Sequence, residues 1–443
     1  MLWDPLGAWG KGRRWVWAAL ACVVGATQGP GFINSLWPPR DVVMDFFQEW
    51  SSGRNLFHGL PIYTDQRTAI EYYMGRVDPS SIFVKVNAHP PTSVLMALPL
   101  ALIDYFDAAF VWNVISLIAL FVSLWLAARE LRIPLTAWTL FPIATLMLLC
   151  SPLRQQIYQG QLNLILLLLL TCTWVADRSD KPVGAGVFLG IAIAIKLFPA
   201  FLLLYFVFRR QWRTVGASVL TLAALTALTA AVLGPDSFRD YARVIPELGR
   251  FRGWWNNVSL TGFCYRLFDP TNETPGMGWR CEALWQCSTL AKASSLLLSG
   301  AVVAAVIAMT RRAQTRTERD LTFSLALTAM LLVSPITWDH YFLLLLVPLA
   351  VVWTQLPASP ATRCLFLATL AGLWLPPAML GRALISSGPV GVATPLQSVL
   401  VLSLPCYALL GLFALEIVEA RASYSRRLSL AHSSQDGSDH VVD

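Results

Sequence analysis

Long apolar runs separated by short polar segments make up most of this chain. A helix needs roughly 20 apolar residues to cross about 30 Å of hydrocarbon, and open strands leave backbone groups unsatisfied there. Each run therefore predicts a membrane helix, and together they predict an all-α polytopic membrane protein. The runs lie near residues 15–36, 105–128, 133–151, 161–176, 183–208, 214–234, 288–309, 321–337, 341–355, 362–380 and 390–416.

The composition indicates that lipid is the main solvent of the chain. Of the 443 residues, 56% are hydrophobic and only 13% are charged, and the mean hydropathy is +0.57, which excludes an ordinary soluble protein. The net charge of +7 would suit nucleic acid, but the Lys and Arg residues flank the apolar runs instead of forming a basic surface. Membrane topology explains this charge better, so we expect no nucleic-acid partner.

Short clusters of basic residues predict the orientation, because cytoplasmic loops accumulate Lys and Arg. For every cluster to lie inside, the run 182–208 must leave and return on the same side, as a hairpin of two short helices broken at residues 196–199. This arrangement gives about 12 membrane segments with both termini in the cytoplasm. The clusters are Arg129 with Arg132, Arg178 with Lys181, Arg209 with Arg210 and Arg213, Arg311 to Arg319, and Arg421 to Arg427.

The same topology leaves two long loops, 37–90 and 235–287, on the extracytoplasmic side of the cell (inner) membrane. We expect any chemistry to face that side. Residues 1–427 then form a single transmembrane domain, and the polar residues 428–443 predict a disordered cytoplasmic tail.

Several function classes lack their sequence signals. The chain has no Walker loop, dinucleotide fingerprint, HExxH helix or nucleophile elbow, and no zinc-ligand spacing, so we expect neither a cofactor nor a metal. No internal repeat is visible, whereas many secondary transporters are built from two related halves. Whether two of Cys264, Cys281 and Cys287 form a disulfide stays open.

Acidic residues follow the outer end of the first apolar run. Asp41, Asp45 and Glu49 have i, i+4, i+8 spacing, which places them on one face if the stretch is helical. An acid at the border of lipid and water is a candidate general base, because partial burial raises its pKa toward working pH. A solvated acidic face is the alternative.

Polar groups at apolar segment ends are the other candidates. Lys196 is the only charge in the run 182–208, and an intramembrane cation suits an anion such as phosphate. Gln161 and Asn163 begin an apolar run, where the amides either bind sugar hydroxyls or cap the helix. The later motifs combine aromatic, amide and basic groups: Asn257, Ser259 and Arg266 in the second loop, then Trp338 and His340 between two apolar runs.

The ordered set of motifs resembles glycosyltransferase family 87, a family of polyprenol-phosphate-sugar-dependent transferases with the type C membrane glycosyltransferase fold. The resemblance covers about residues 45–341. Its pieces are Asp45-Phe46, Gly59-Leu60-Pro61-Ile62-Tyr63, Pro90-Pro91, Gly160-Gln161-Leu162-Asn163, Lys196-Leu197-Phe198-Pro199, Asn257-Val258-Ser259-Leu260 with Arg266, and Ser334-Pro335-Ile336-Thr337-Trp338 with His340.

The resemblance implies a hexosyltransferase that moves a sugar, mannose above all, from a polyprenyl-phosphate-linked donor to a lipid or glycan acceptor. It implies an inverting displacement with Asp45, rather than Asp41, as the general base. We expect Lys196, Arg266 and His340 at the donor phosphate, and Gln161, Asn163, Asn257, Ser259 and Trp338 at the sugar or acceptor. His89 stands where the family tends to carry an aromatic residue, so no role is carried over to it.

Two other classes of function stay open at this point. A secondary transporter or lipid flippase also uses broken helices and a buried lysine. A non-catalytic assembly subunit would have no need of Asp45. The sugar, the acceptor, the linkage and the oligomeric state are not set by these patterns.

Overall fold

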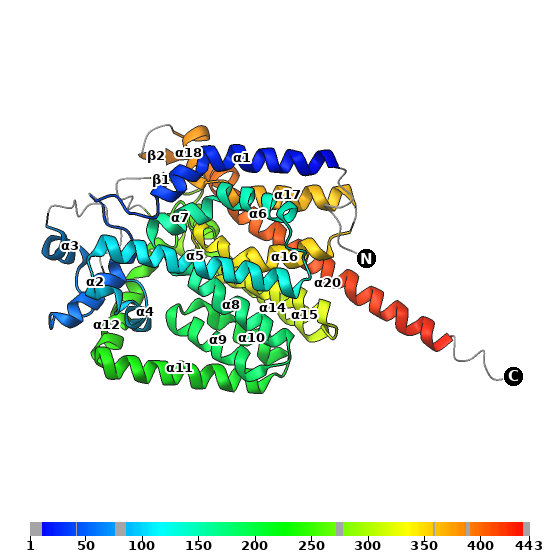
Figure 1. Ribbon diagram of the computed structural model, residues 1–443, viewed down its shortest axis with the longest axis horizontal. Helices are drawn as coiled ribbons and strands as arrows, with labels where there is room; N and C mark the ends of the chain where they lie inside the picture. The colour runs from blue at the N-terminus through cyan, green and yellow to red at the C-terminus, as the bar shows by residue number, and fades with distance from the viewer. Residues whose placement is uncertain are drawn as a thin grey trace.

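The computed structural model describes residues 11–40, 42–75, 86–271, 278–357, 359–386 and 390–436. Long helices run roughly side by side along the longest axis, with short helices and loops gathered at one end (Figure 1). The buried side chains form one large apolar core between these helices, with a smaller cluster at the short helices α2 (Phe46–Phe57) and α4 (Pro91–Ala97). Asp41 lies outside the described residues, and α2 begins only at Phe46.

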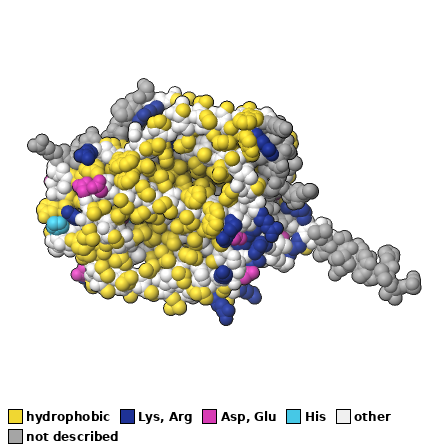
Figure 2. Space-filling model, in the orientation of Figure 1, with side chains coloured by type: hydrophobic (Ala, Val, Ile, Leu, Met, Phe, Trp, Pro, Cys, Tyr) yellow, Lys and Arg dark blue, Asp and Glu magenta, His cyan; other side chains and the backbone are white. Residues whose placement is uncertain are grey.

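Four helices in the described residues are long and apolar enough to cross a membrane, and up to seven spans result if each bent pair is one span. Hydrophobic side chains cover much of the face seen in Figure 2, as expected of a multi-pass membrane protein. The predicted 12 segments stay a prediction. The four helices are α1 (Lys11–Asn34), α5 (Tyr105–Glu130), α11 (Trp212–Leu233) and α14 (Ser288–Arg312); the bent pairs join α6 (Ala137–Leu149) to α7 (Ser151–Gln159), α17 (Pro360–Trp374) to α18 (Pro377–Leu384), and α19 (Pro395–Gln397) with the π-helix η6 (Ser398–Leu402) to α20 (Leu404–Asp436).

The helix break predicted at residues 196–199 is present. Helix α9 (Pro182–Ile195) ends just before Lys196, and the 3₁₀ turn η3 (Phe198–Phe201) leads into α10 (Leu202–Phe208). Arg209, just after α10, lies 2.6 Å from Asp177 near the end of α8 (Asn163–Arg178), so α10 returns to the end of the bundle where α9 starts. The two helices therefore form the predicted hairpin, with Lys196 at its tip.

Close packing against α11 holds this hairpin. Gly190 on α9 faces α11, where an added Cβ would lie 2.6 Å from the Ser218 carbonyl oxygen and 2.7 Å from the Thr221 Cβ. Gly186 is equally close to α11. Because glycine has no side chain, the two backbones approach closely, as at other small-residue crossings in membranes. Helix α9 is thereby fixed, and so is the position of the tip.

The end of the bundle that carries Asp45, called here the Asp45 end, is built from short elements. It includes a two-stranded parallel sheet within the otherwise helical protein: β1 (Gly278–Cys281) pairs with β2 (Val390–Ala393), so the predicted apolar run 390–416 begins as a strand and not as a membrane helix. All eight cysteines lie within the described residues, and none forms a disulfide. The short helices are α2 (Phe46–Phe57), α3 (Gln66–Met74), α4 (Pro91–Ala97), η2 (Leu100–Leu102), α12 (Asp236–Val244), η4 (Ile245–Phe251) and α13 (Leu260–Phe268).

The opposite end, called here the arginine-rich end, gathers most of the basic clusters. Arg178 lies 3.5 Å from Asp320 of α15 (Arg316–Val333), and Arg427 of α20 lies 2.9 Å from Glu318. Figure 2 shows Lys and Arg side chains concentrated at this end of the molecule, where α20 leaves the body in Figure 1. Helix α20 runs to Asp436, so residues 428–436 are helical where a disordered tail was predicted.

Candidate active site

Asp45 occupies the position just before the first turn of α2. It does not cap the helix with its side chain, and the residue is half-buried. Instead, one carboxylate oxygen, Oδ2, accepts a hydrogen bond of 2.5 Å from the Gln161 amide. The other oxygen has no hydrogen-bond partner within the described part of the chain, so it is available to accept a proton from a bound hydroxyl.

Gln161 connects Asp45 to Lys196. Its amide oxygen lies 3.3 Å from the Lys196 Nζ, and the Asn163 amide oxygen lies 3.0 Å from the same atom. Lys196 is 4% exposed. The two amides hold the lysine at the tip of the hairpin, and their role in sugar binding stays a prediction.

Gly160 allows α2 to lie close to Gln161. Its φ of +65° is left-handed, which ends α7 and turns the chain toward Gln161. An added Cβ would lie 2.7 Å from the Phe46 Cβ, and the Gly160 carbonyl accepts from the Trp112 indole at 2.8 Å. The close approach that this glycine permits is therefore that of α2, which places Asp45 beside Gln161.

Tyr341 brings Lys196 and His340 to one place. The Lys196 Nζ lies 4.3 Å from the centre of the Tyr341 ring, and the His340 ring centre lies 5.0 Å from it. His340 is 4% exposed, yet neither ring nitrogen has a hydrogen-bond partner within the described residues. The nearest acid, Asp339, lies 3.6 Å from Nδ1. An unpaired buried imidazole is costly unless a ligand completes it. His340 and Tyr341 both lie near the start of the 3₁₀ helix η5 (Asp339–Leu345), which leads into α16 (Leu346–Gln355).

The contact between Glu49 and His89 was not predicted from the sequence. Glu49 lies one turn after Asp45 on α2 and is 2% exposed, and its Oε1 lies 2.5 Å from the Nδ1 of His89. The Tyr63 hydroxyl donates to the His89 carbonyl at 2.6 Å. Burial raises the pKa of the Tyr63 phenol well above its ordinary value, and Tyr241 and Glu49 add to the effect, so this donor keeps its proton. In the sequence, the i, i+4 spacing of Asp45 and Glu49 was the one signal that Glu49 lies near the site.

The second-loop residues have structural partners. Asn257 is fully buried, and its side chain bonds the backbone of Arg252, Pro335 and Thr337, which joins the second loop to the segment before η5. Ser259 accepts from the Gly262 N–H at 3.0 Å and caps α13. These contacts position the His340 segment, and a direct role of either residue in sugar binding stays a prediction.

Within the described residues, no contact joins Arg266 to Lys196 or His340. It is 1% exposed and donates to the Asn257 carbonyl and, at 2.9 Å, to the Ser403 hydroxyl. Trp338 is half-buried against the core, with its ring 6.0 Å from that of Phe251. The predicted convergence of three basic groups is therefore seen for Lys196 and His340 alone.

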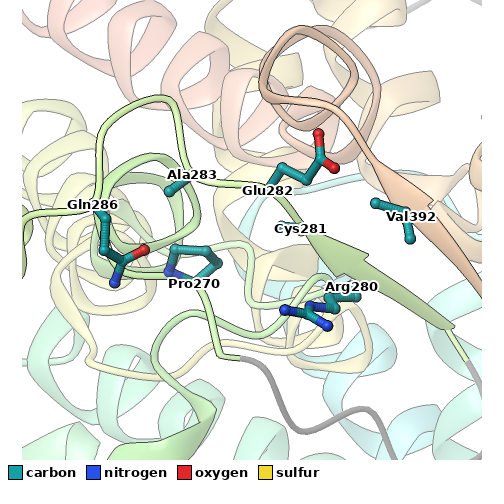
Figure 3. Close-up of a pocket in the computed structure, with 7 residues that line it drawn as sticks. All are labelled: Pro270, Arg280, Cys281, Glu282, Ala283, Gln286 and Val392. Atoms are coloured by element: carbon teal, nitrogen blue, oxygen red, sulfur yellow. The ribbon is translucent and has the colours of Figure 1, made fainter.

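A separate hollow lies beside the small sheet. It has a volume of about 420 Å³ and is lined by seven residues, which Figure 3 labels: Pro270, Arg280, Cys281, Glu282, Ala283, Gln286 and Val392. None of these residues is among those described above around Asp45 and Lys196. Within the described ranges, no group of three or more His, Cys, Asp or Glu side chains is arranged to hold a metal ion.

Comparison with known proteins assigns a family. The model of glycosyltransferase family 87 matches residues 87–335, more than half of the 443 residues. The chain is 26% identical over 345 residues to the polyprenol-phosphate-mannose-dependent alpha-(1-2)-phosphatidylinositol mannoside mannosyltransferase of Mycolicibacterium smegmatis, covering 73% of this chain and 72% of that protein. The protein of the same description from Mycobacterium tuberculosis is 25% identical over 77% of each chain.

An alpha-(1->3)-arabinofuranosyltransferase of Corynebacterium glutamicum is 29% identical over 52% of each chain. No solved structure matches, so the type C fold stays a prediction. The resemblance drawn from the sequence motifs is confirmed by the family match and by these relatives. This chain is a glycosyltransferase, and it belongs to glycosyltransferase family 87.

Proposed function

We propose that this protein transfers mannose from polyprenol-phosphate-mannose to a glycolipid or glycan acceptor on the extracytoplasmic face of the membrane. The mannosyltransferases of both mycobacterial species are named for this donor. The observation that carries the proposal is the connected set of Asp45, Gln161 and Lys196, with a carboxylate and a cation linked through one amide. Such a set supplies a base and a phosphate partner within one site.

Asp45 is the general base of the proposed displacement. Its free oxygen takes the proton of an acceptor hydroxyl while that hydroxyl's oxygen bonds to the anomeric carbon of the donor. The bond from the anomeric carbon to the phosphate oxygen breaks, and its electron pair leaves with the polyprenyl phosphate. A single displacement of this kind inverts the anomeric configuration, because the acceptor attacks opposite the leaving phosphate. Gln161 fixes the second carboxylate oxygen and so orients the base.

Lys196 and His340 serve the leaving phosphate, which gains negative charge as the bond breaks. Both side chains lie against Tyr341, and His340 has unpaired ring nitrogens within the described part of the chain. Fixed donors and cations placed where charge develops lower the barrier most in a site that excludes water. Arg266 acts through Asn257, whose contacts hold the segment before His340.

The proposed orientation follows from the arginine-rich end. Arg178, Arg209 and Arg319 all lie at that end, opposite the tip of the hairpin. Positively charged loops accumulate in the cytoplasm, so the Asp45 end faces the opposite side. Arg67 on α3, at the Asp45 end, is exposed. A cysteine there, in a chain without its native cysteines, would react with an impermeant thiol reagent in intact cells.

A transfer assay tests the function. The full chain, purified into lipid nanodiscs, is given labelled polyprenol-phosphate-mannose and a phosphatidylinositol mannoside acceptor, with no ion gradient. We expect labelled product whose new linkage has the anomeric configuration opposite to that of the donor. Retention of configuration would exclude the single displacement. Transfer of arabinofuranose, and not mannose, from the corresponding polyprenyl-phosphate donor would move the substrate to that of the Corynebacterium relative.

The alternative of a transporter or flippase gives a different result in the same preparation. It predicts no covalent product in nanodiscs, where the two faces share one solution. It also predicts movement of lipid-linked sugar across sealed proteoliposomes. The family match favours the transferase.

A further inference from the structure

Two acids lie on the segment of α2 that is linked to the buried Lys196, yet neither forms its hydrogen bonds. Asp45 is joined to Lys196 through the Gln161 amide, and Glu49 lies one turn further along α2. In the described residues, its hydrogen-bond partners are the neutral amide oxygens of Gln161 and Asn163. A buried lysine beside buried carboxylates would ordinarily be expected to pair with one of them. The arrangement therefore needs an explanation.

Each acid is held by a partner of its own. Asp45 Oδ2 accepts from the Gln161 amide at 2.5 Å, and Glu49 Oε1 lies 2.5 Å from the His89 Nδ1. Within the described residues, Lys196 therefore has no direct contact with a carboxylate.

The backbone of His89 is fixed by several contacts. Its N–H donates to the Asn87 side chain at 2.9 Å, and its carbonyl accepts from Tyr63 at 2.6 Å. Asn87 in turn donates to the Gln48 carbonyl and the Ser52 hydroxyl, both at 3.1 Å on α2. These contacts fix the backbone of His89 next to α2, so His89 acts as an anchor for the Glu49 side chain.

We propose that His89 is a positioning residue that holds Glu49, which leaves Lys196 available to the phosphate of the donor lipid. The inference rests on the proposed function, because it assumes that Lys196 binds this phosphate. It adds a role for the Glu49–His89 pair, which lies next to the base without being the base. Loss of His89 frees an uncompensated carboxylate beside Lys196, and this carboxylate then competes with the phosphate.

Opposite changes in donor affinity test the proposal. His89→Asn should raise the KM for polyprenol-phosphate-mannose roughly tenfold, since a carboxylate that has lost its partner can pair with Lys196 and repel phosphate. The acceptor KM should change little. Glu49→Gln should lower the donor KM and strengthen inhibition by free polyprenyl phosphate. In the double variant, removal of the carboxylate should return the donor KM to within about threefold of the wild-type value.

His58→Asn is the matched control, because His58 is an exposed histidine of the same loop whose ring lies against Tyr72 and Tyr73. It should leave the donor KM unchanged. If the pair had a purely structural role, His89→Asn and Glu49→Gln would both raise the donor KM, and the double variant would be at least as impaired. This result would overturn the proposal. An unchanged donor KM in His89→Asn would overturn it as well.

Failure of the proposed function looks different, since the wild-type protein itself would then show no transfer. Should His89→Asn not fold, Glu49→Gln alone decides. Weaker, and not stronger, inhibition by polyprenyl phosphate in that variant contradicts the inference.

Discussion

The two ends of the bundle differ in what their lysine and arginine side chains contact. At the arginine-rich end, the buried acids Asp177 and Glu318 each face an arginine, at 2.6 Å and 2.9 Å. At the Asp45 end, the acid and the cation are joined through a neutral amide, and His340 has no hydrogen-bond partner within the described residues. Paired charges hold helices together, whereas charges kept apart can act on a ligand. The comparison separates scaffold from site.

The largest contrast is expected between two aspartates. Asp45→Asn keeps the shape of the side chain but removes the base, so turnover should fall by roughly 10² or more. Asp177→Asn breaks a buried ion pair with Arg209, and such a break costs about 3–5 kcal/mol of stability. Its turnover per folded molecule should stay within about threefold of the wild-type value. Transfer assays and thermal unfolding in the same nanodiscs measure both effects.

Equal losses of turnover in the two variants would remove the distinction between the ends. A fully active Asp45→Asn would show that another group takes the proton.

The cations offer the next contrast. Lys196→Ala should lower kcat/KM for the donor by roughly tenfold to a hundredfold, since a charge is lost where the phosphate leaves. Lys196→Arg should keep part of the activity, because a point charge tolerates a moderate change of shape. Arg209→Ala is the control at the other end, where stability and not donor affinity should fall. An unaffected donor KM in Lys196→Ala would place the phosphate elsewhere.

Arg266 tests whether a buried cation at the Asp45 end can have a purely structural role. Its guanidinium bonds the Asn257 carbonyl and the Ser403 hydroxyl. Arg266→Ala should therefore cost about 2–4 kcal/mol of stability and lower kcat, through loss of the Asn257 contacts. Donor KM and acceptor KM should move together. A selective rise in donor KM with unchanged stability would instead restore Arg266 as a phosphate ligand.

Local patterns predicted much of this molecule. The helix break before Pro199 and the position of Asp45 beside α2 could be read from short motifs. The Glu49–His89 pair joins residues 40 positions apart, and the Arg266–Ser403 contact joins residues 137 apart. The β1–β2 pairing is of the same kind. A single sequence carries no signal for such contacts, because hydrophobic periodicity reports which face of an element is buried and not what covers it.

The smallest expected effect concerns the packing that sets the tip of the hairpin. Gly190→Ala places a methyl group 2.6 Å from the Ser218 carbonyl on α11, so α9 must shift, at a cost of about 1–3 kcal/mol. Lys196 lies six residues further along and moves with the helix, so donor KM should rise modestly while acceptor KM does not.

Gly184→Ala is the matched control on α9, because its added Cβ would lie 3.7 Å from the Ala176 Cβ, an ordinary contact. That variant should be as stable as the wild type, since alanine favours helix over glycine by about 1 kcal/mol. Thermal unfolding and donor titration compare the two. If both variants behave alike, the α9–α11 contact does not set the position of Lys196, and Gln161 and Asn163 alone hold the lysine in the site.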